Sequence, residues 1–491
     1  MSFPSPTIKE ILERYKVIWA LNHASSLMGW DREVNMPEEG IGGRSLAAAE
    51  IAKLVQKLML DEEFVKLIDK ADGEELTDIE RGVVRMLKRD LKFYRKVPPE
   101  IVAEFAKVTS EAFVAWRTAK EKADFKVFAP YLERVVQLAR VIADKLGYEE
   151  HPYDALLDLH EEGLTSRDVE NIFSTLEPGI RRLLDKISTS GWPKHHPLEE
   201  EPYDRRSMEE AIREILATIG YPERRFRIDV SPHPFTIGIA SPFDVRITVR
   251  YPPKDFKEPL FSAIHEFGHA LYELGVDEAL AYTPVGTGVS LGVHESQSRF
   301  WENIVGRSRQ FVSLISPILR RHLSNLARYS DEDIYYYFNV VRPSLIRTEA
   351  DEVTYNLHIL LRYRIERLMI AGEVKVTDVP SLWNEEMERL LGVRPRNDAE
   401  GVLQDIHWSH GSIGYFPTYT LGNVIAAQIK YAMGFLEDAV ASGDFAKIKE
   451  WLRERIHRWG ATYPPKELVR RATGETYNPS YLLKYLENKY R

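Results

Sequence analysis

Apolar residues recur at intervals of three and four positions through most of the 491 residues, the spacing that gives a helix one buried face. One region alternates apolar and polar residues instead, at 226–230 and 244–250, where Val245, Ile247 and Val249 share a face. We therefore expect a mainly helical protein with one small antiparallel sheet. The expected helices cover roughly 78–96, 99–120, 127–146, 167–188, 206–219, 298–328, 331–340, 352–371 and 420–457.

Composition narrows the class of protein. With 44% hydrophobic residues the chain can bury a large core. Its net charge of −9 is spread along the sequence without a basic stripe, which predicts no nucleic-acid partner. No run of eighteen apolar residues occurs, and the first residues lack the apolar region of a signal peptide, so we expect a cytoplasmic protein without a membrane partner.

The chain shows no fixed-period repeat and no linker rich in Gly, Ser or Pro. We therefore predict a single catalytic domain over residues 1–491, with two lobes around a cleft. The sequence contains no cysteine, so any metal ion must be held by His, Asp or Glu.

One such group is His265-Glu266-x-x-His269. In a helix, residues four apart lie above one another, so both imidazoles can reach one metal ion. Glu266 lies about 100° round the helix, where it can take a proton from a nearby water without being a ligand. Apolar neighbours around the motif argue against two ordinary surface histidines. Gly268 is unusual inside a helix and indicates a close approach by another group.

A catalytic zinc site commonly has three protein ligands and an open position. The candidate third ligand is Glu295, in His294-Glu295-Ser296-Gln297, which opens a second predicted helix. The alternative interpretation is that Glu295 is a first-turn residue favoured by the helix dipole. The spacing by itself does not separate the two.

Six short motifs, read in order along the chain, resemble those of the carboxypeptidase Taq family of thermostable metallocarboxypeptidases. They span residues 233–408 without a departure from the family pattern. The motifs are His233-Pro234-Phe235, Asp244-x-Arg246-x-Thr248, His265-Glu266-x-x-His269, His294-Glu295-Ser296-Gln297, Ile346-Arg347-x-x-Ala350-Asp351 and Gly401-x-x-Gln404-Asp405-x-His407-Trp408.

The resemblance implies a two-lobed helical fold with a deep groove, similar to neurolysin and angiotensin-converting enzyme. It also implies a homodimer, one zinc ion (Zn²⁺) per chain that cobalt (Co²⁺) can replace, and release of single C-terminal amino acids with broad specificity. In this family pattern His265, His269 and Glu295 are the metal ligands and Glu266 is the general base.

The expected reaction is attack of a zinc-bound water on the scissile carbonyl, with Glu266 accepting the proton of that water. The oxyanion needs further donors. By similarity to the wider fold group we expect His410 and Tyr419 in this role, with Tyr415 as the rival. Aromatic packing beside a Gly/Pro turn is the alternative for each.

A carboxypeptidase must recognise a free carboxylate, and Arg347 is the family's candidate. The alternative is a solvated charged face with Glu349 and Asp351, or an Asp351 that orients a ligand histidine. The strand from Asp244 could pair its edge with an extended peptide. The remaining candidates for substrate contact are His233, Asp244, Arg246, Gln404, His407 and Tyr415.

Two rival functions remain. An endopeptidase or dipeptidase on the same scaffold would need a groove open at both ends and no carboxylate-binding arginine. A non-catalytic peptide-binding or scaffold protein would have lost Glu266 or a ligand, and all four residues are present. A zinc aminopeptidase should carry a Gly-x-Met-Glu-Asn motif, which this chain lacks.

Overall fold

A computed structural model describes residues 2–491, which form two compact units. The first unit contains residues up to 91 together with 196–338 and 426–476. The second contains 92–195, 339–425 and 477–491. The helices α4 (Asp78–Lys96) and α16 (Pro417–Ala432) each include a boundary between the units. The prediction of a single domain over 1–491 stays a prediction.

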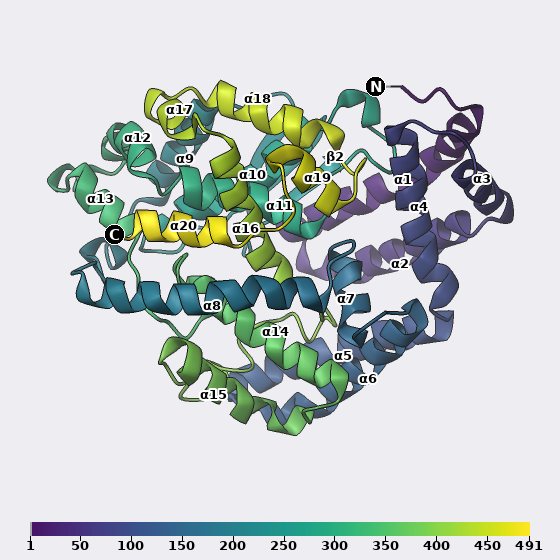
Figure 1. The fold of residues 1–491 in the computed structure, drawn as a ribbon, viewed down its shortest axis with the longest axis horizontal. Coiled ribbons are helices and arrows are strands. Elements are labelled where there is room, and N and C mark those ends of the chain that lie inside the picture. The colour runs from purple at the N-terminus through teal and green to yellow at the C-terminus, as the bar shows by residue number, and fades with distance from the viewer. Residues whose placement is uncertain (1) are drawn as a thin grey trace. The chain divides into compact units, whose positions relative to one another are not determined.

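The first unit holds the only sheet in the described part of the chain and thirteen of its helices, α4 included (Figure 1). Besides α4, these helices are α1 (Pro6–Val34), α2 (Ile41–Met59), α3 (Glu62–Asp72), α9 (Arg205–Ile219), α10 (Lys257–Gly275), α11 (Leu291–Arg299), the π-helix η5 (Phe300–Val305), α12 (Arg309–His322), α13 (Asp331–Phe338), α17 (Leu436–Ser442), α18 (Phe445–Arg455) and α19 (Pro465–Thr473).

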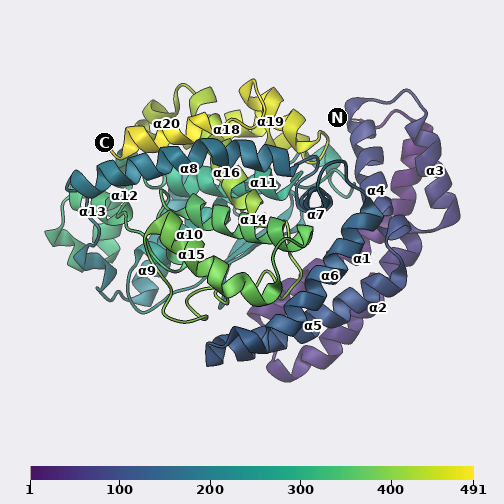
Figure 2. The ribbon, with the colours of Figure 1, turned by 60° about the horizontal axis from the view of Figure 1, so that its bottom comes forward.

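The second unit is built from helices, and α14 (Tyr355–Ala371) packs against four others in it. Most of α14 is buried, because apolar residues occupy nearly every face of the helix. In Figure 2, α5 lies beside α6. The helices of this unit besides α14 are α5 (Pro99–Lys122), α6 (Ala129–Leu146), α7 (Pro152–His160), α8 (Ser166–Thr189), α15 (Val379–Leu391) and α20 (Ser480–Lys489).

The sheet has three strands, β1 (Phe226–Val230), β2 (Thr236–Ala240) and β3 (Asp244–Val249), in the order β1-β3-β2. The expected antiparallel sheet was wrong in one respect, because β1 pairs with β3 in parallel and only β2 pairs antiparallel. Prolines at 232 and 234 lack the amide proton that a ladder needs, so the chain leaves β1 before it turns back. Period-two alternation predicts a strand but not its direction.

Two of the expected helices are interrupted. The stretch 298–328 contains the π-helix η5, after which Ser308 caps a separate helix α12 by accepting a hydrogen bond from the Phe311 amide at 3.2 Å. The stretch 420–457 is divided into α16, α17 and α18. Gly443 follows α17 with φ of 72°, a left-handed conformation that ends a helix readily.

Helix α10 forms the centre of the first unit. It packs against β2, β3, α11 and η5, and most of its residues are buried. Val245, Ile247 and Val249 of β3 are each 0% exposed, which confirms their predicted shared face. None of the helices within residues 2–491 is long and apolar enough to cross a membrane. The mainly helical prediction is confirmed, and α10 is held rigidly in this packing.

Candidate metal site

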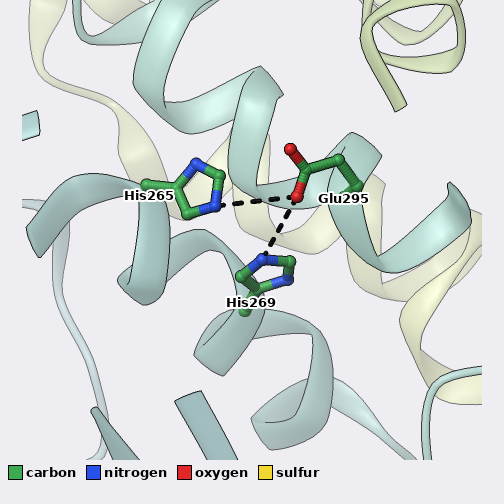
Figure 3. A group of neighbouring side chains, drawn as sticks. All are labelled: His265, His269 and Glu295. Atoms are coloured by element: carbon green, nitrogen blue, oxygen red, sulfur yellow. Dashed lines mark ion pairs between the residues drawn. The ribbon is translucent and has the colours of Figure 1, made fainter. Parts of the chain in front are cut away.

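His265 and His269 project from the same side of α10, one helical turn apart (Figure 3). Their ring centroids lie 5.0 Å apart, and both side chains are half-buried. The apolar residues around them are buried as the sequence predicted, Phe261, Ile264 and Phe267 among them. The helical spacing of the motif therefore presents two imidazoles to one point.

Glu295 reaches that point from α11 (Figure 3). Its Oε2 lies 3.6 Å from His265 Nε2 and 3.5 Å from His269 Nε2. The three residues offer ligand atoms that lie within 4.8 Å of one another, so the group could hold a metal ion. Glu295 lies beyond the first turn of α11, which Ser290 caps, so the first-turn interpretation of Glu295 was wrong.

A glycine allows the two helices to meet. A Cβ atom added to Gly268 would lie 2.6 Å from the carbonyl oxygen of Gln297 and 2.7 Å from Cα of Ser298. Both atoms belong to the backbone of α11, so only glycine permits this approach. The sequence indicated a close approach at Gly268, and the approaching group is the helix that carries Glu295.

The other ring nitrogen of each histidine also has a partner. His265 Nδ1 lies 2.8 Å from Oε2 of Glu302 in the π-helix η5, and Arg299 Nη1 donates to the same oxygen at 3.1 Å. His269 Nδ1 lies 2.8 Å from Nδ1 of His294. Both contacts leave the Nε2 atoms facing Glu295. Glu302 could not be predicted from the sequence, because it is 37 positions from His265 and follows no local spacing rule.

Negative carboxylates and positively charged or protonatable side chains alternate around the site. Burial by itself would raise the pKa of Glu295, but Arg299 and the two histidines lower it well below its usual range. Burial favours neutral His265, yet the carboxylates of Glu295 and Glu302 outweigh burial and raise its pKa. Burial lowers the pKa of His269. The negative charge of these carboxylates beside two imidazole nitrogens favours binding of a positively charged metal ion.

Glu266 follows His265 on α10 and is buried. The hydroxyl of Thr236 on β2 lies 2.7 Å from Glu266 Oε2 and 2.8 Å from the Glu266 carbonyl oxygen. The strand therefore fixes the carboxylate of the predicted general base. Sequence reasoning missed Thr236, which directly follows the His233-Pro234-Phe235 motif.

Arg347 lies in the second unit and is 7% exposed, so the interpretation as a solvated charged face was wrong. Its Nε and Nη2 donate to Oδ1 of Asp405 at 2.9 and 2.8 Å, and its Nη1 donates to the hydroxyl of Tyr355 at 3.1 Å. A second arginine, Arg362, donates to the other oxygen of Asp405 at 2.6 Å. Despite burial, Asp405 raises the pKa of Arg347 above its ordinary value, so the group stays charged.

Gln404 joins these two arginines. Its Oε1 accepts from the Arg347 amide at 2.9 Å and from Arg362 Nη2 at 2.8 Å, and its Nε2 donates to two backbone carbonyls. Asp351 is likewise engaged, since its oxygens accept from the amides of Arg342, Val353 and Thr354. Gln404 and Asp351 therefore hold the backbone around Arg347 in place through hydrogen bonds.

The aromatic residues between 415 and 419 pack around His407. Its Nε2 lies 3.2 Å from the hydroxyl of Tyr419, and its ring packs on Phe416, Tyr415 and Tyr419. Burial lowers the pKa of His407 to about 3, so the ring is neutral near pH 7. The amide of His410 donates to the His407 carbonyl at 3.2 Å, but its ring is exposed and packs on Phe113 of α5 at 5.3 Å.

The remaining candidates belong to the sheet region. Asp244 and Arg246 form a bidentate pair at 2.7 and 2.8 Å, and the Arg246 guanidinium lies over Trp30 of α1 at 4.5 Å. His233 is exposed, and its carbonyl accepts from Ser231. The predicted peptide-binding edge at 244–250 was wrong, because β3 is the central strand and both of its edges are already paired.

Known proteins match this chain over nearly its whole length. It is 54% identical to thermostable carboxypeptidase 1 of Pyrococcus furiosus and 39% identical to thermostable carboxypeptidase 1 of Thermus thermophilus, with 99% of each chain covered in both cases. The solved structure of Pyrococcus furiosus carboxypeptidase superposes with a TM-score of 0.98 at 53% identity, covering 100% of both chains. Trypanosoma cruzi metallocarboxypeptidase 1 gives a TM-score of 0.93 at 33% identity over 99% of both chains.

The sequence profile of the carboxypeptidase Taq (M32) metallopeptidases matches residues 9–490. This match covers both units, and with it the metal-ligand group and the arginine cluster. The chain is thus an enzyme, a peptide hydrolase that uses a metal cofactor. It belongs to the carboxypeptidase Taq (M32) family of metallopeptidases.

Proposed function

We propose that this enzyme is a zinc-dependent carboxypeptidase that releases single C-terminal amino acids from peptides with broad specificity. The observation that carries the proposal is the convergence of His265, His269 and Glu295 beside Glu266 in a chain of this family. Peptides with a free C-terminal carboxylate are the proposed substrates.

The proposed ligands are Nε2 of His265, Nε2 of His269 and Oε2 of Glu295. Two nitrogens and one oxygen are a common donor set for catalytic zinc, and three protein ligands leave a position open. Partners at both Nδ1 atoms support this assignment, because they direct the Nε2 atoms toward one point. A bound zinc ion would polarise the scissile carbonyl and lower the pKa of the attacking water, and Co²⁺ is proposed to substitute for it.

Glu266 is the proposed general base. Its carboxylate accepts the proton of the attacking water and then passes a proton to the leaving amine. The contact of Thr236 with Oε2 supports this role, since it restrains the carboxylate while the other oxygen stays available. Burial of Glu266 keeps competing water away from the proton it carries.

Arg347 is proposed to bind the C-terminal carboxylate of the peptide. The hydrogen-bonded cluster of Arg347, Arg362 and Asp405 contains two guanidiniums and one carboxylate. Such a cluster, nearly enclosed in protein, carries one positive charge in excess, and a substrate carboxylate would neutralise it. Arg347 has five N–H groups, of which three are occupied by Asp405 and Tyr355, so two can serve a ligand.

Tyr419 and His410 remain the proposed donors to the oxyanion, with Tyr415 as the rival. The contact of Tyr419 with neutral His407 supports an oriented hydroxyl. His410 has less support, since it packs on Phe113 at the surface. We also propose His233, Asp244, Arg246, Gln404 and His407 as further residues that contact the substrate.

The state of the protein in the cell is also proposed from its relatives. Relatives named thermostable carboxypeptidase 1 that match over 99% of the chain support one thermostable catalytic domain over residues 1–491. A cytoplasmic location and a homodimer are the proposed location and assembly. Sedimentation at equilibrium tests the assembly, because a monomer of 56.7 kDa and a dimer differ twofold in mass.

The proposed activity is tested with a blocked peptide of mixed sequence, offered with a free or an amidated C-terminus to zinc-loaded protein. Mass spectrometry should show stepwise loss of single C-terminal residues from the free peptide only, and a chelator should stop it. Internal cuts in both peptides would instead indicate an endopeptidase. Zinc binding without any cleavage would favour a peptide-binding protein.

A matched variant separates binding from chemistry. Glu266→Gln keeps the size of the side chain and removes the basic oxygen, so we expect zinc to bind at one per chain while kcat falls by about 10²–10⁴-fold. Normal turnover by this variant would rule out Glu266 as the general base.

A further inference from the structure

A line of partly buried hydrogen bonds extends behind His269, one of the proposed ligands. His269 Nδ1 lies 2.8 Å from His294 Nδ1, and His294 Nε2 lies 2.7 Å from Oε1 of Glu273. Glu273 is on α10, one turn beyond His269, and is 4% exposed. The three side chains therefore form a continuous chain that ends on a buried carboxylate.

The positions of the protons in this chain are determined by the contacts. A hydrogen bond between two imidazole nitrogens needs a proton on one and a lone pair on the other. If His294 Nδ1 donates, the single proton of neutral His269 lies on Nε2, the atom that faces Glu295. That tautomer cannot bind a metal ion through Nε2. If His294 Nδ1 accepts, His269 carries its proton on Nδ1 and presents a lone pair at Nε2.

Glu273 selects the second arrangement. Its carboxylate accepts hydrogen bonds from the Ser241 hydroxyl, from the Thr287 hydroxyl at 3.0 Å and from the Gly288 amide at 3.0 Å. Although burial opposes a charge, His294, the Ser241 hydroxyl and the Gly288 amide lower the pKa of Glu273 to about 2. An ionised carboxylate accepts only, so His294 holds a proton on Nε2, and an imidazole with a single proton there presents a lone pair at Nδ1.

The walls around His294 also hold it in place. A Cβ atom on Gly288 would lie 2.6 Å from Cδ2 and 2.9 Å from Nε2 of His294. On another side Tyr272 packs against the imidazole with ring centroids 5.0 Å apart, and its hydroxyl accepts from the Val289 amide at 3.2 Å. The imidazole of His294 is thus fixed in orientation as well as in tautomer.

The two proposed histidine ligands are held in different ways. His265 contacts a carboxylate directly, whereas His269 contacts the imidazole of His294, which in turn contacts the carboxylate of Glu273. We propose that His294, backed by Glu273, is a positioning residue that sets the tautomer of His269 and so raises the affinity of the site for zinc. This inference rests on the ligand role of His269 in the proposed function.

The test measures the zinc affinity of the purified, metal-free full chain by competition with a coloured chelator. His294→Leu removes the acceptor for His269 Nδ1, and we expect zinc affinity to fall about 10–100-fold. His294→Asn keeps an acceptor, because Oδ1 of asparagine occupies the place of Nδ1 in histidine, and should remain within about threefold of the native affinity. Thermal unfolding by circular dichroism checks that each variant is folded.

Two further variants test the proposal even if the His294→Leu variant does not fold. Thr287→Val removes one donor to Glu273 and should weaken zinc binding by a smaller factor, about two- to fivefold. His457→Gln is the matched control: His457 is buried and packs on Tyr272 at 5.2 Å but is hydrogen-bonded to Gln297, so zinc affinity should not change.

An absorption spectrum distinguishes a specific effect of His294 on His269 from a nonspecific loss of structure around the site. With Co²⁺ in the site, the visible absorption bands report the ligand field, so His294→Leu should shift them while His294→Asn and His457→Gln retain the native spectrum. Native zinc affinity in folded His294→Leu would overturn the proposal, as would equal losses in His294→Leu and His294→Asn. Native zinc affinity in His269→Ala would instead show that the proposed ligand set itself is wrong.

Discussion

The hydroxyl of Thr236 lies 2.7 Å from Oε2 of Glu266, which joins a strand of the sheet to the proposed general base. Thr236→Val keeps the shape of the side chain and removes this donor. A hydrogen bond to a charged acceptor contributes about 1.5–3 kcal/mol, so we expect kcat to fall about tenfold or more. KM and zinc content should stay close to native, as steady-state kinetics and metal analysis can measure.

Thr236→Ser is the matched control, because serine retains the hydroxyl and loses only a methyl group. It should keep most of the native kcat. An equal loss of kcat in both variants would assign the effect to packing of β2 rather than to the hydroxyl.

Gly268→Ala should push α11 away from α10. The new Cβ would meet backbone atoms of Gln297 and Ser298 at 2.6 and 2.7 Å, and overpacking of this kind costs about 1–3 kcal/mol of stability. Zinc affinity should fall as well, because Glu295 moves with α11. Chemical unfolding and chelator competition measure the two effects. Gly43→Ala in α2 is the control: the added Cβ atom would have no neighbour within 4 Å, so the change should be neutral or slightly stabilising.

Arg347→Lys should raise KM for peptides with a free C-terminus by about tenfold or more. Lysine keeps the charge but cannot hold Asp405 through two N–H groups and bind a carboxylate bidentately as well. Kinetics on free peptides test this, and zinc content should be unchanged. Arg364→Lys is the control: Arg364 lies in α14 and pairs with Glu177 and Glu386, so this change should leave KM as it is. An unchanged KM in Arg347→Lys would remove Arg347 from substrate binding.

Acidification should destabilise the first unit through His457. Burial lowers its pKa from 6.5 to about 3, so below pH 6.5 the unfolded chain binds a proton that the folded chain does not. Its contribution to stability is complete above pH 6.5 and is lost as pH falls toward 3. The loss amounts to about 1.4 kcal/mol per pH unit, or about 2–3 kcal/mol between pH 6.5 and 4.5.

His457→Gln should therefore make the free energy of unfolding less dependent on pH in this window, as denaturant titrations at several pH values would measure. Glutamine still offers a donor to Oε1 of Gln297, the partner of His457 Nε2 at 2.8 Å. Parallel profiles for native protein and His457→Gln would contradict the buried neutral state.

Much of the proposed metal centre could be predicted from local spacing. The separation of His265 and His269 follows from 3.6 residues per turn, and the apolar residues around them are buried as expected. Glu295 required the family resemblance, because the approach of α11 depends on packing between helices. Gly268 gave a sequence signal of that approach without identifying the group that approaches.

The sequence by itself determined the helical class, the faces of the helices, the strands β1 and β3, and the paired imidazoles of α10. Backbone geometry fixes these features over a few residues. Only the tertiary structure decided that β3 is the central strand, that Glu302 and Glu273 support the histidines, and that Arg347 is buried on Asp405. Those contacts join residues 21 to 58 positions apart, except within the sheet, and depend on how separate elements pack rather than on the geometry of any one of them.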